Sequence, residues 1–347
     1  MKIHTARSFP FVILSALGAC VAVFSADGAP SARNAIEPTA QARTGDLVVD
    51  GNLPRYEPSK ESLKAKLRVA GSSTVSVLLD RAGDGFKRVA PDVSFDIKGE
   101  GSSAGIAALL GGTADLVGLS RQLSAKERSD FQAKFSYPPT ELIVGFDPVA
   151  VYVRKDNPID SMTLADVSAV FGAAPSAGRS SAKVWGDFGL AGDFATLPLS
   201  VFGFRSESSH ANPLKESVLA GGSFRSELQM QMTPGAIVTA VSGTKGGVGY
   251  LSPHPTYASA STKTVPLARA DGQGAVAPTQ ATVSDGTYPL NLPMYVYINR
   301  KPATAVPAPT REFLTFVLSK EGQDIAAGQR WFSIPASLAQ QQLAKLK

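Results

Sequence analysis

Residues 101–105, Gly-Ser-Ser-Ala-Gly, have types and spacing that could perform chemistry. They fit the G-x-S-x-G pattern, in which Ser103 would sit on a strained strand-to-helix turn and attack an acyl group. They also fit a loop that opens a helix, where backbone N–H groups and the hydroxyls of Ser102 and Ser103 would hold an anion. The first interpretation predicts a serine hydrolase, and the second predicts a binding protein.

The hydrolase interpretation requires a histidine base that follows the serine and an acidic residue in the chain. The chain has three histidines, His4, His210 and His254. His254 lies in the proline-flanked stretch "LSPHPTY", which is typical of a solvated histidine, and no HGGG-type oxyanion segment is present. No cluster of His, Cys or Asp has the spacing of metal ligands. We therefore expect no catalytic residue, no metal and no cofactor, with the hydrolase kept as an alternative.

Two further turns have the same design of strand, serine pair and helix. One follows a predicted strand at 67–69 and the other a predicted strand at 198–204. The turn after the strand at 67–69 is the small-residue stretch "AGSST", and the turn after the strand at 198–204 carries Arg205, Ser208 and Ser209. Helix starts expose unpaired N–H groups and a partial positive charge. Serine is also favoured there simply as an N-cap, but three such starts at the carboxyl ends of strands predict an anion site.

The elements that would position these turns alternate between short apolar runs and helical periodicity, which indicates an α/β fold. Helix residues Val75, Leu78, Leu79, Ala82 and Phe86 recur at the spacing of one buried face. The stretches "VGFDPVAVYVRKDNPI" and "YPLNLPMYVYINRKP" predict a pair of strands that cross between two lobes. Lobe I would comprise residues 67–150 plus 290–347, and lobe II residues 151–289. Each lobe would be a sheet flanked by helices, with a ligand cleft between the lobes.

The composition of the 347-residue chain excludes some classes of protein. Its formal charge of +5 comes from 34 basic and 29 acidic residues dispersed along the chain. Nucleic-acid binding would require basic residues clustered on one face, so we expect none. The single cysteine, Cys20, excludes an internal disulfide.

The N-terminus predicts export from the cytoplasm. Residues 1–26 place Lys2 and Arg7 before an apolar run that is followed by small residues, as in a signal peptide. The run is shorter than the ~20 residues of a membrane span. Cys20 ends "LGAC", which resembles a lipobox for lipid anchoring, whereas "VFS" could end an ordinary signal, and both remain open. Residues 27–66 lack sustained periodicity and predict a linker or loosely attached arm.

Several motifs in a defined order resemble one family. They are "AGSSTV", "GEGSSAGIAALLGGTADLVGLSRQLS", "DPVAVYVRKDNP", "KVWGDFGL", "FGFRSESS", "GGVGYLS", "YPLNLPMYVYINRKP" and "FVLSKEGQ". Between residues 67 and 335 the chain resembles the phosphate-specific substrate-binding proteins of bacterial ABC transporters, which belong to the type II periplasmic-binding superfamily. The resemblance implies a monomeric two-lobed protein that closes on phosphate or a similar tetrahedral oxyanion and delivers it to ABC permease subunits.

The resemblance also assigns individual residues. Ser73, Thr74 and Val75 match the family's first binding loop, and Ser102, with Ser103 beside it, matches the second. Arg205 and Ser209 keep the spacing of the third loop, where Arg205 would form a bidentate contact with the oxyanion.

Two positions depart from the family pattern. His210 follows Ser209 where the family commonly has glycine. Ser120 stands where the best-known phosphate binders have an aspartate that accepts the proton of hydrogen phosphate and repels sulfate. Because serine can donate as well as accept, the choice between phosphate and sulfate stays open, with Glu100 and Asp96 as candidates for the missing acceptor. A stand-alone exported anion binder, acting as a sensor, scavenger or surface interaction protein, is the alternative function.

Overall fold

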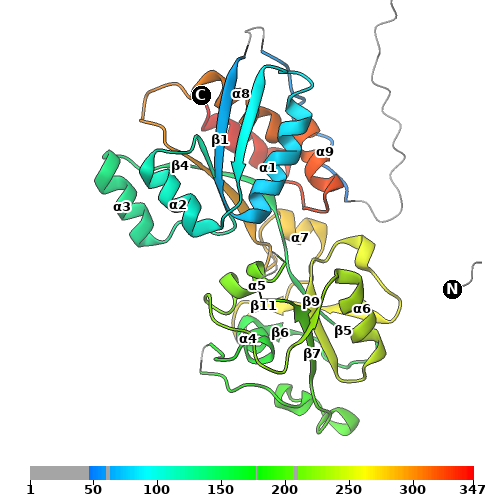
Figure 1. Cartoon of the computed structure of the whole chain (residues 1–347). Coiled ribbons are helices and arrows are strands. Elements are labelled where there is room, and N and C mark those ends of the chain that lie inside the picture. Colours follow the sequence, from blue (N-terminus) through cyan, green and yellow to red (C-terminus); the bar gives the residue numbers. More distant parts are fainter. Residues whose placement is uncertain (1–46, 60–62, 177, 207–209) are drawn as a thin grey trace, which may run out of the picture. The chain divides into compact units, whose positions relative to one another are not determined.

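Two five-stranded sheets organise the chain, each within its own lobe (Figure 1). The computed structural model describes residues 47–59, 63–176, 178–206 and 210–347. In spatial order, the first sheet consists of β2 (Val93–Lys98), β1 (Ala65–Gly71), β3 (Leu116–Leu119), β12 (Pro293–Ile298) and β4 (Thr140–Phe146). The second consists of β10 (Thr262–Val265), β5 (Ala150–Arg154), β9 (Gly247–Leu251), β7 (Ser200–Phe204) and β8 (Gln229–Gln231). The short strands β11 (Leu267–Ala268) and β6 (Met162–Thr163) pair separately.

Helices flank both sheets, as the sequence predicts. The helices of the first lobe are α1 (Ser73–Phe86), α2 (Ser102–Gly111), α3 (Ala125–Phe135), α8 (Ala308–Val317), α9 (Lys320–Gly328) and α10 (Ala336–Ala344). Those of the second are α4 (Leu164–Phe171), α5 (Asn212–Ser217) and α6 (Pro234–Gly243), with the 3-10 turns η1 (Trp185–Phe188), η2 (Gly192–Phe194) and η3 (Pro255–Tyr257). Helix α7 (Gln280–Ser284) lies in the segment that returns to the first lobe.

The pairing of the strands brings the serine turns to one edge. Strand β1 runs parallel to both β2 and β3. Helix α1 begins directly after β1, α2 begins shortly after β2, and Ser120 follows β3. Since parallel strands end at the same edge of a sheet, the first two serine turns and Ser120 all lie at the carboxyl edge of the first sheet.

The buried face of α1 agrees with its sequence periodicity. Val75, Leu78, Leu79, Ala82 and Phe86 are all buried against the sheet and neighbouring helices. The Phe86 ring contacts those of Phe313 and Phe316 from α8, at centroid distances of 5.5 Å. These contacts join an N-terminal and a C-terminal helix in one core.

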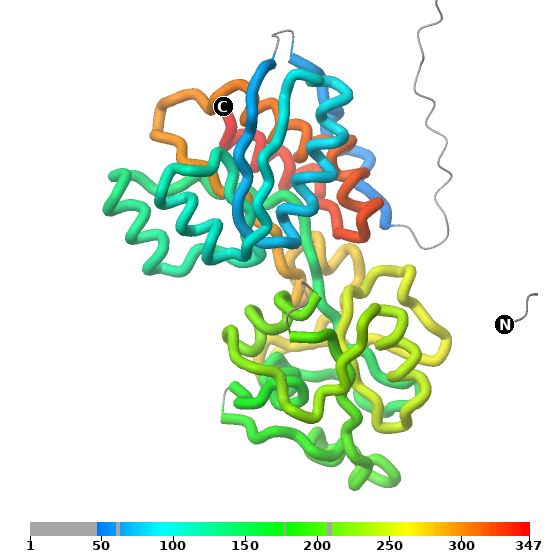
Figure 2. The backbone as a smooth tube through the Cα atoms, viewed as in Figure 1, coloured from blue at the N-terminus to red at the C-terminus, as the bar shows by residue number. Residues whose placement is uncertain are grey.

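The chain crosses between the lobes in two adjacent segments, which the backbone trace in Figure 2 shows side by side. The first crossing is the three-residue step from β4 to β5, and the second precedes β12. The Asp147 amide donates to the Leu292 carbonyl at 2.9 Å, and the Val149 amide donates to the Leu290 carbonyl at 3.1 Å. These bonds fix the two crossings to one another at the base of the cleft.

The described part of the expected loose arm is packed instead. Leu47 and Leu53 are only 8% and 4% exposed and join the hydrophobic core. Asp50 Oδ2 accepts a hydrogen bond of 2.8 Å from the Ala336 amide at the start of α10, and the Lys320 amide donates to the Pro54 carbonyl. The sequence predicts a loose arm here because single buried apolar residues, unlike those of a helix or strand, do not recur with a regular period. Residues 47–56 therefore form a strap on the first lobe.

The predicted signal peptide, residues 1–26, and its Cys20 lie outside the described residues. Within the described ranges, no helix has the length and apolar character needed to cross a membrane.

Candidate ligand-binding cleft

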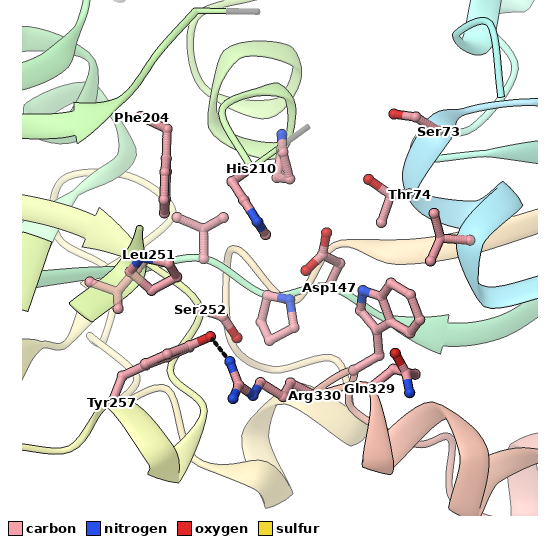
Figure 3. A pocket seen from close by; sticks show the side chains of 16 residues that line it. Ser73, Thr74, Asp147, Phe204, His210, Leu251, Ser252, Tyr257, Gln329 and Arg330 are labelled. Atoms are coloured by element: carbon pink, nitrogen blue, oxygen red, sulfur yellow. Dashed lines mark hydrogen bonds between the residues drawn. The ribbon is translucent and has the colours of Figure 1, made fainter. Parts of the chain in front are cut away.

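The first binding turn lies at the start of α1, on the wall of a cavity of about 350 Å³ between the lobes (Figure 3). Ser73 and Thr74 line the cavity, and the first N–H groups of α1 have no partner within the helix. Val75 is completely buried and its side chain packs on Gly118 of β3. Ser73 and Thr74 can thus offer hydroxyl and backbone donors, whereas Val75 can offer only its N–H.

The second turn is held close to the first by glycine contacts. A Cβ atom on Gly105 would lie 2.6 Å from the Cα of Gly71, so α2 rests directly on the end of β1. Gly71 has a φ of 129°, and a Cβ there would lie 1.9 Å from the Gly118 carbonyl oxygen. The final glycine of the Gly-Ser-Ser-Ala-Gly segment therefore serves this close packing.

The two serines of this segment have different surroundings. Ser103 is exposed, and neither serine is among the described residues that line the cavity. Ser102 lies inward, with its Oγ 3.4 Å from the Oγ of Ser120. The structure therefore groups Ser102 with Ser120 and leaves Ser103 apart from them.

Ser120 connects the two lobes. Its hydroxyl donates a hydrogen bond of 3.0 Å to Oε2 of Glu216 in α5. The guanidinium of the next residue, Arg121, donates two hydrogen bonds of 2.9 Å to the carboxylate of Glu127. The bonds from Arg121 lower the pKa of Glu127 to about 2. Arg121 is thus held by Glu127 instead of facing the cavity with a free charge.

Asp147 is a site residue that the sequence reasoning missed. Its carboxyl group lies in the cavity between Thr74 and His210 (Figure 3). It also borders a smaller recess together with Thr74 and Ser120. Burial raises the pKa of Asp147 from 3.8 to about 7. An acidic residue inside the otherwise apolar crossing "VGFDPVAV" was the available signal.

The third turn is described in part. Arg205 is exposed and directly follows β7, whose last residue, Phe204, lines the cavity. Ser208 and Ser209 lie outside the described residues. His210 lines the cavity with its ring centroid 5.0 Å from that of Phe204, and burial lowers the pKa of the imidazole.

Residues that the sequence did not single out form the opposite wall. Arg330 of the first lobe donates from Nη1 to the hydroxyl of Tyr257 in the second at 2.8 Å, and its guanidinium lies 5.4 Å from the centre of that ring. Trp331 and Ser252 complete this wall. Arg330 therefore adds a positive charge and a second contact between the lobes.

His254 is buried in the structure, and the described residues contain no metal-binding cluster. His254 is 3% exposed, and its Nδ1 accepts a hydrogen bond of 3.1 Å from the Thr256 amide. It is thus buried and structural, in contrast to the solvated histidine expected from its proline-flanked loop. Across the described ranges, no group of three or more His, Cys, Asp or Glu residues could hold a metal ion.

Comparisons with known proteins agree with this arrangement. Residues 41–321 match the model of a PBP superfamily domain. The phosphate-binding protein PstS of Pseudomonas aeruginosa is 35% identical over 306 residues, which are 88% of this chain and 94% of that protein.

Two crystal structures share the fold. A possible phosphate binding protein from Planctomyces limnophilus has a TM-score of 0.68 at 23% identity, covering 82% of this chain and 98% of that one. An ABC-type phosphate transport receptor from Vibrio cholerae has a TM-score of 0.59 at 19% identity, covering 77% and 99%. The expected two-lobed α/β fold is confirmed.

Proposed function

Because the chain belongs to the PBP superfamily and, within it, to the phosphate-binding proteins of the PstS family, we propose that it captures phosphate in the cleft between its lobes. The family consists of solute-binding proteins of ABC transport and not of enzymes, so the hydrolase alternative is set aside. Ser103 then has no role as a nucleophile.

The convergence of hydrogen-bond donors with the half-buried acceptor Asp147 carries this proposal. The starts of α1 and α2 lie at the same sheet edge, and Thr74, Ser120 and Asp147 border one recess. Hydrogen phosphate needs both kinds of group, because its bare oxygens accept hydrogen bonds while its P–OH donates one. Sulfate at neutral pH has no proton to donate. A site that combines many donors with a carboxylate acceptor therefore suits phosphate.

Asp147 supplies a carboxylate acceptor at the recess where Ser120 stands in place of the family's aspartate. Of the two sequence candidates, Asp96 pairs with Lys66 at 3.2 Å on the edge strand β2, and Glu100 is exposed in the loop before α2. Asp147, by contrast, faces the cavity. Arg205 and His210 would approach the anion from the second lobe, and Ser208 and Ser209 remain proposed ligands from the sequence.

Membership of the family supports a cellular role in ABC transport. The protein is exported through residues 1–26, with Cys20 as the residue that would carry a lipid, and acts as a monomer that hands phosphate to ABC permease subunits. A stand-alone anion binder would share the cleft but not the last step. Phosphate-dependent stimulation of the permease ATPase in reconstituted vesicles separates these two roles.

Titration calorimetry of ligand-stripped protein tests the binding function. We expect heat and a thermal shift with phosphate and a weaker response to sulfate. Absence of both signals with both anions would contradict the proposal.

The same titration applied to Arg205→Ala tests the third turn. Losing a hydrogen bond to a charged partner should weaken phosphate binding by about 1.5–3 kcal/mol. Arg179→Ala is the matched control, because that guanidinium pairs with Asp166 and Asp271 within the second lobe. If Arg205→Ala binds phosphate as tightly as Arg179→Ala does, Arg205 is not a ligand.

A further inference from the structure

A chain of hydrogen bonds runs from the second binding turn across the cleft. Oγ of Ser120 donates to the Glu216 carboxylate at 3.0 Å, and Oγ of Ser102 lies 3.4 Å from that of Ser120. Ser102 and Ser120 belong to the first lobe, whereas Glu216 belongs to α5 of the second. This series of hydrogen bonds therefore depends on the approach of the two lobes.

The direction of the protons in this chain follows from the chemistry of serine. A hydroxyl has one proton to donate and two lone pairs that can accept. Once the Ser120 proton points to Glu216, Ser102 must be the donor in the contact between the serines. One lone pair of Ser120 remains, and it can only accept. The ambiguity of serine as donor or acceptor is thereby removed at this position.

We propose that Glu216 is a positioning residue that orients the Ser120 hydroxyl as an acceptor, so that the closed cleft selects a protonated tetrahedral oxyanion over a fully ionised one. This inference rests on the proposed phosphate-binding function and deepens it. Ser120 would accept the ligand's O–H from one side of the recess that it shares with Asp147 and Thr74. A fully ionised anion would meet a lone pair there, with no proton between them.

The charges around Ser120 support this selection. Arg121 is the adjacent cation, and its two hydrogen bonds bind it to Glu127. Asp147 borders the recess as a second acidic group. Glu216 and Asp147 thus surround Ser120 with acceptors, while the donors of the site lie at the starts of α1 and α2. Because Glu216 comes from the opposite lobe, the selection operates when the lobes approach.

The test measures the ratio of the sulfate dissociation constant to the phosphate dissociation constant. Calorimetry gives both constants, and displacement of bound phosphate gives the sulfate constant if sulfate binding releases little heat. Glu216→Ala should reduce this ratio roughly tenfold, the effect of one net hydrogen bond. Glu216→Gln should keep most of the ratio, because its amide oxygen can accept the same bond from Ser120.

Two comparisons separate orientation of the hydroxyl from a simple effect of charge. In a Ser120→Ala background, Glu216→Ala should leave the ratio unchanged, whereas a charge effect would persist. Glu100→Gln is the matched control, since it removes an exposed carboxylate two residues before Ser102 and should alter both affinities by a similar factor.

Results that contradict the role of Glu216 differ from results that contradict phosphate binding itself. An unchanged ratio in Glu216→Ala, or a Glu216→Gln variant that loses as much of the ratio as Glu216→Ala, would overturn the role of Glu216 while phosphate binding stands. A wild-type protein that binds neither anion would overturn the proposed function and this inference together. Circular dichroism and thermal unfolding establish that each variant is folded before titration.

Discussion

At the scale of single residues, Asp147 occupies a position that opposes folding and supports binding. Burial raises its pKa from 3.8 to about 7, because the ionised carboxylate loses its hydration. The folded ligand-free protein therefore holds this proton more tightly than the unfolded chain does. Ionisation of Asp147 leaves the free energy of unfolding unchanged near pH 3. It lowers this free energy between about pH 4 and 7, and it lowers it no further at higher pH.

Replacement of Asp147 by asparagine should therefore stabilise the ligand-free protein at high pH. A pKa difference corresponds to about 1.4 kcal/mol per unit, so we expect a gain of up to a few kcal/mol at pH 8 that shrinks toward pH 4. Urea unfolding of wild type and Asp147→Asn at pH 4, 6 and 8 measures this gain. The same variant should bind phosphate more weakly, because it lacks the charged acceptor.

Neighbouring groups do not offset the charge of Asp147 in this prediction. His210 lines the same cavity, but burial lowers the pKa of its imidazole and favours the neutral form. Arg330 keeps its positive charge while it donates to the Tyr257 hydroxyl, and burial is what raises the pKa of Asp147. Equal stabilities at pH 8, or unaltered phosphate affinity in Asp147→Asn, would show that Asp147 is not the buried acceptor of the site.

At the scale of elements, small residues set the distance between the two helix starts. Gly105 of α2 touches Gly71 at the end of β1, so the two serine turns share one edge with little space between their backbones. The pattern that suggests a nucleophile elbow thus results from helix-to-strand packing. Helix α5 has only six residues, and Leu214 within it is buried, as are Val218 and Leu219 directly after it.

Two glycines of α2 provide a matched test of this packing. A Cβ on Gly105 would lie 2.6 Å from the Gly71 Cα, so Gly105→Ala must shift backbone and should destabilise the protein by about 1–3 kcal/mol. The shift would also separate Ser102 from Ser73 and weaken phosphate binding.

Gly111→Ala is the control within the same helix. Its Cβ would lie 3.5 Å from the Thr113 side chain, which is an ordinary contact, and alanine favours helix by up to about 1 kcal/mol. Thermal unfolding and phosphate titration of both variants give the comparison. Similar behaviour of the two variants would show that the α2 contact does not position the site.

At the scale of the whole molecule, the strap ties the N-terminal segment to helices from the other end of the chain. Besides its bond to α10, it reaches α7 through paired hydrogen bonds between the Val48 backbone and the Gln280 side chain. Tyr56 contacts Glu312 of α8 and, through its amide, Glu321 of α9. The first lobe is therefore completed by residues that precede its first strand.

Truncation of the strap's buried anchor should destabilise the fold without affecting the site. Leu53 is 4% exposed, so Leu53→Ala should cost about 2–5 kcal/mol. Val48, 72% exposed in the same strap, is the control, and Val48→Ala should remain within about 0.5 kcal/mol of wild type. Chemical unfolding measures both, and phosphate affinity should be equal in the two variants. Equal stabilities would mean that the strap adds nothing to the first lobe.

Local patterns in the sequence determined the α/β class, the buried face of α1 and the serine turns at Ser73, Thr74 and Ser102. Periodicity and helix-start chemistry depend on neighbours in the chain, so they can be recognised without a structure. The roles of Asp147, Glu216 and Arg330 were decided only by tertiary structure. Their significance depends on which residues of the other lobe they meet, and burial or a contact across a cleft leaves no trace in local spacing. For the same reason, the acceptors that we propose near Ser120 come from the crossing between the lobes and from α5.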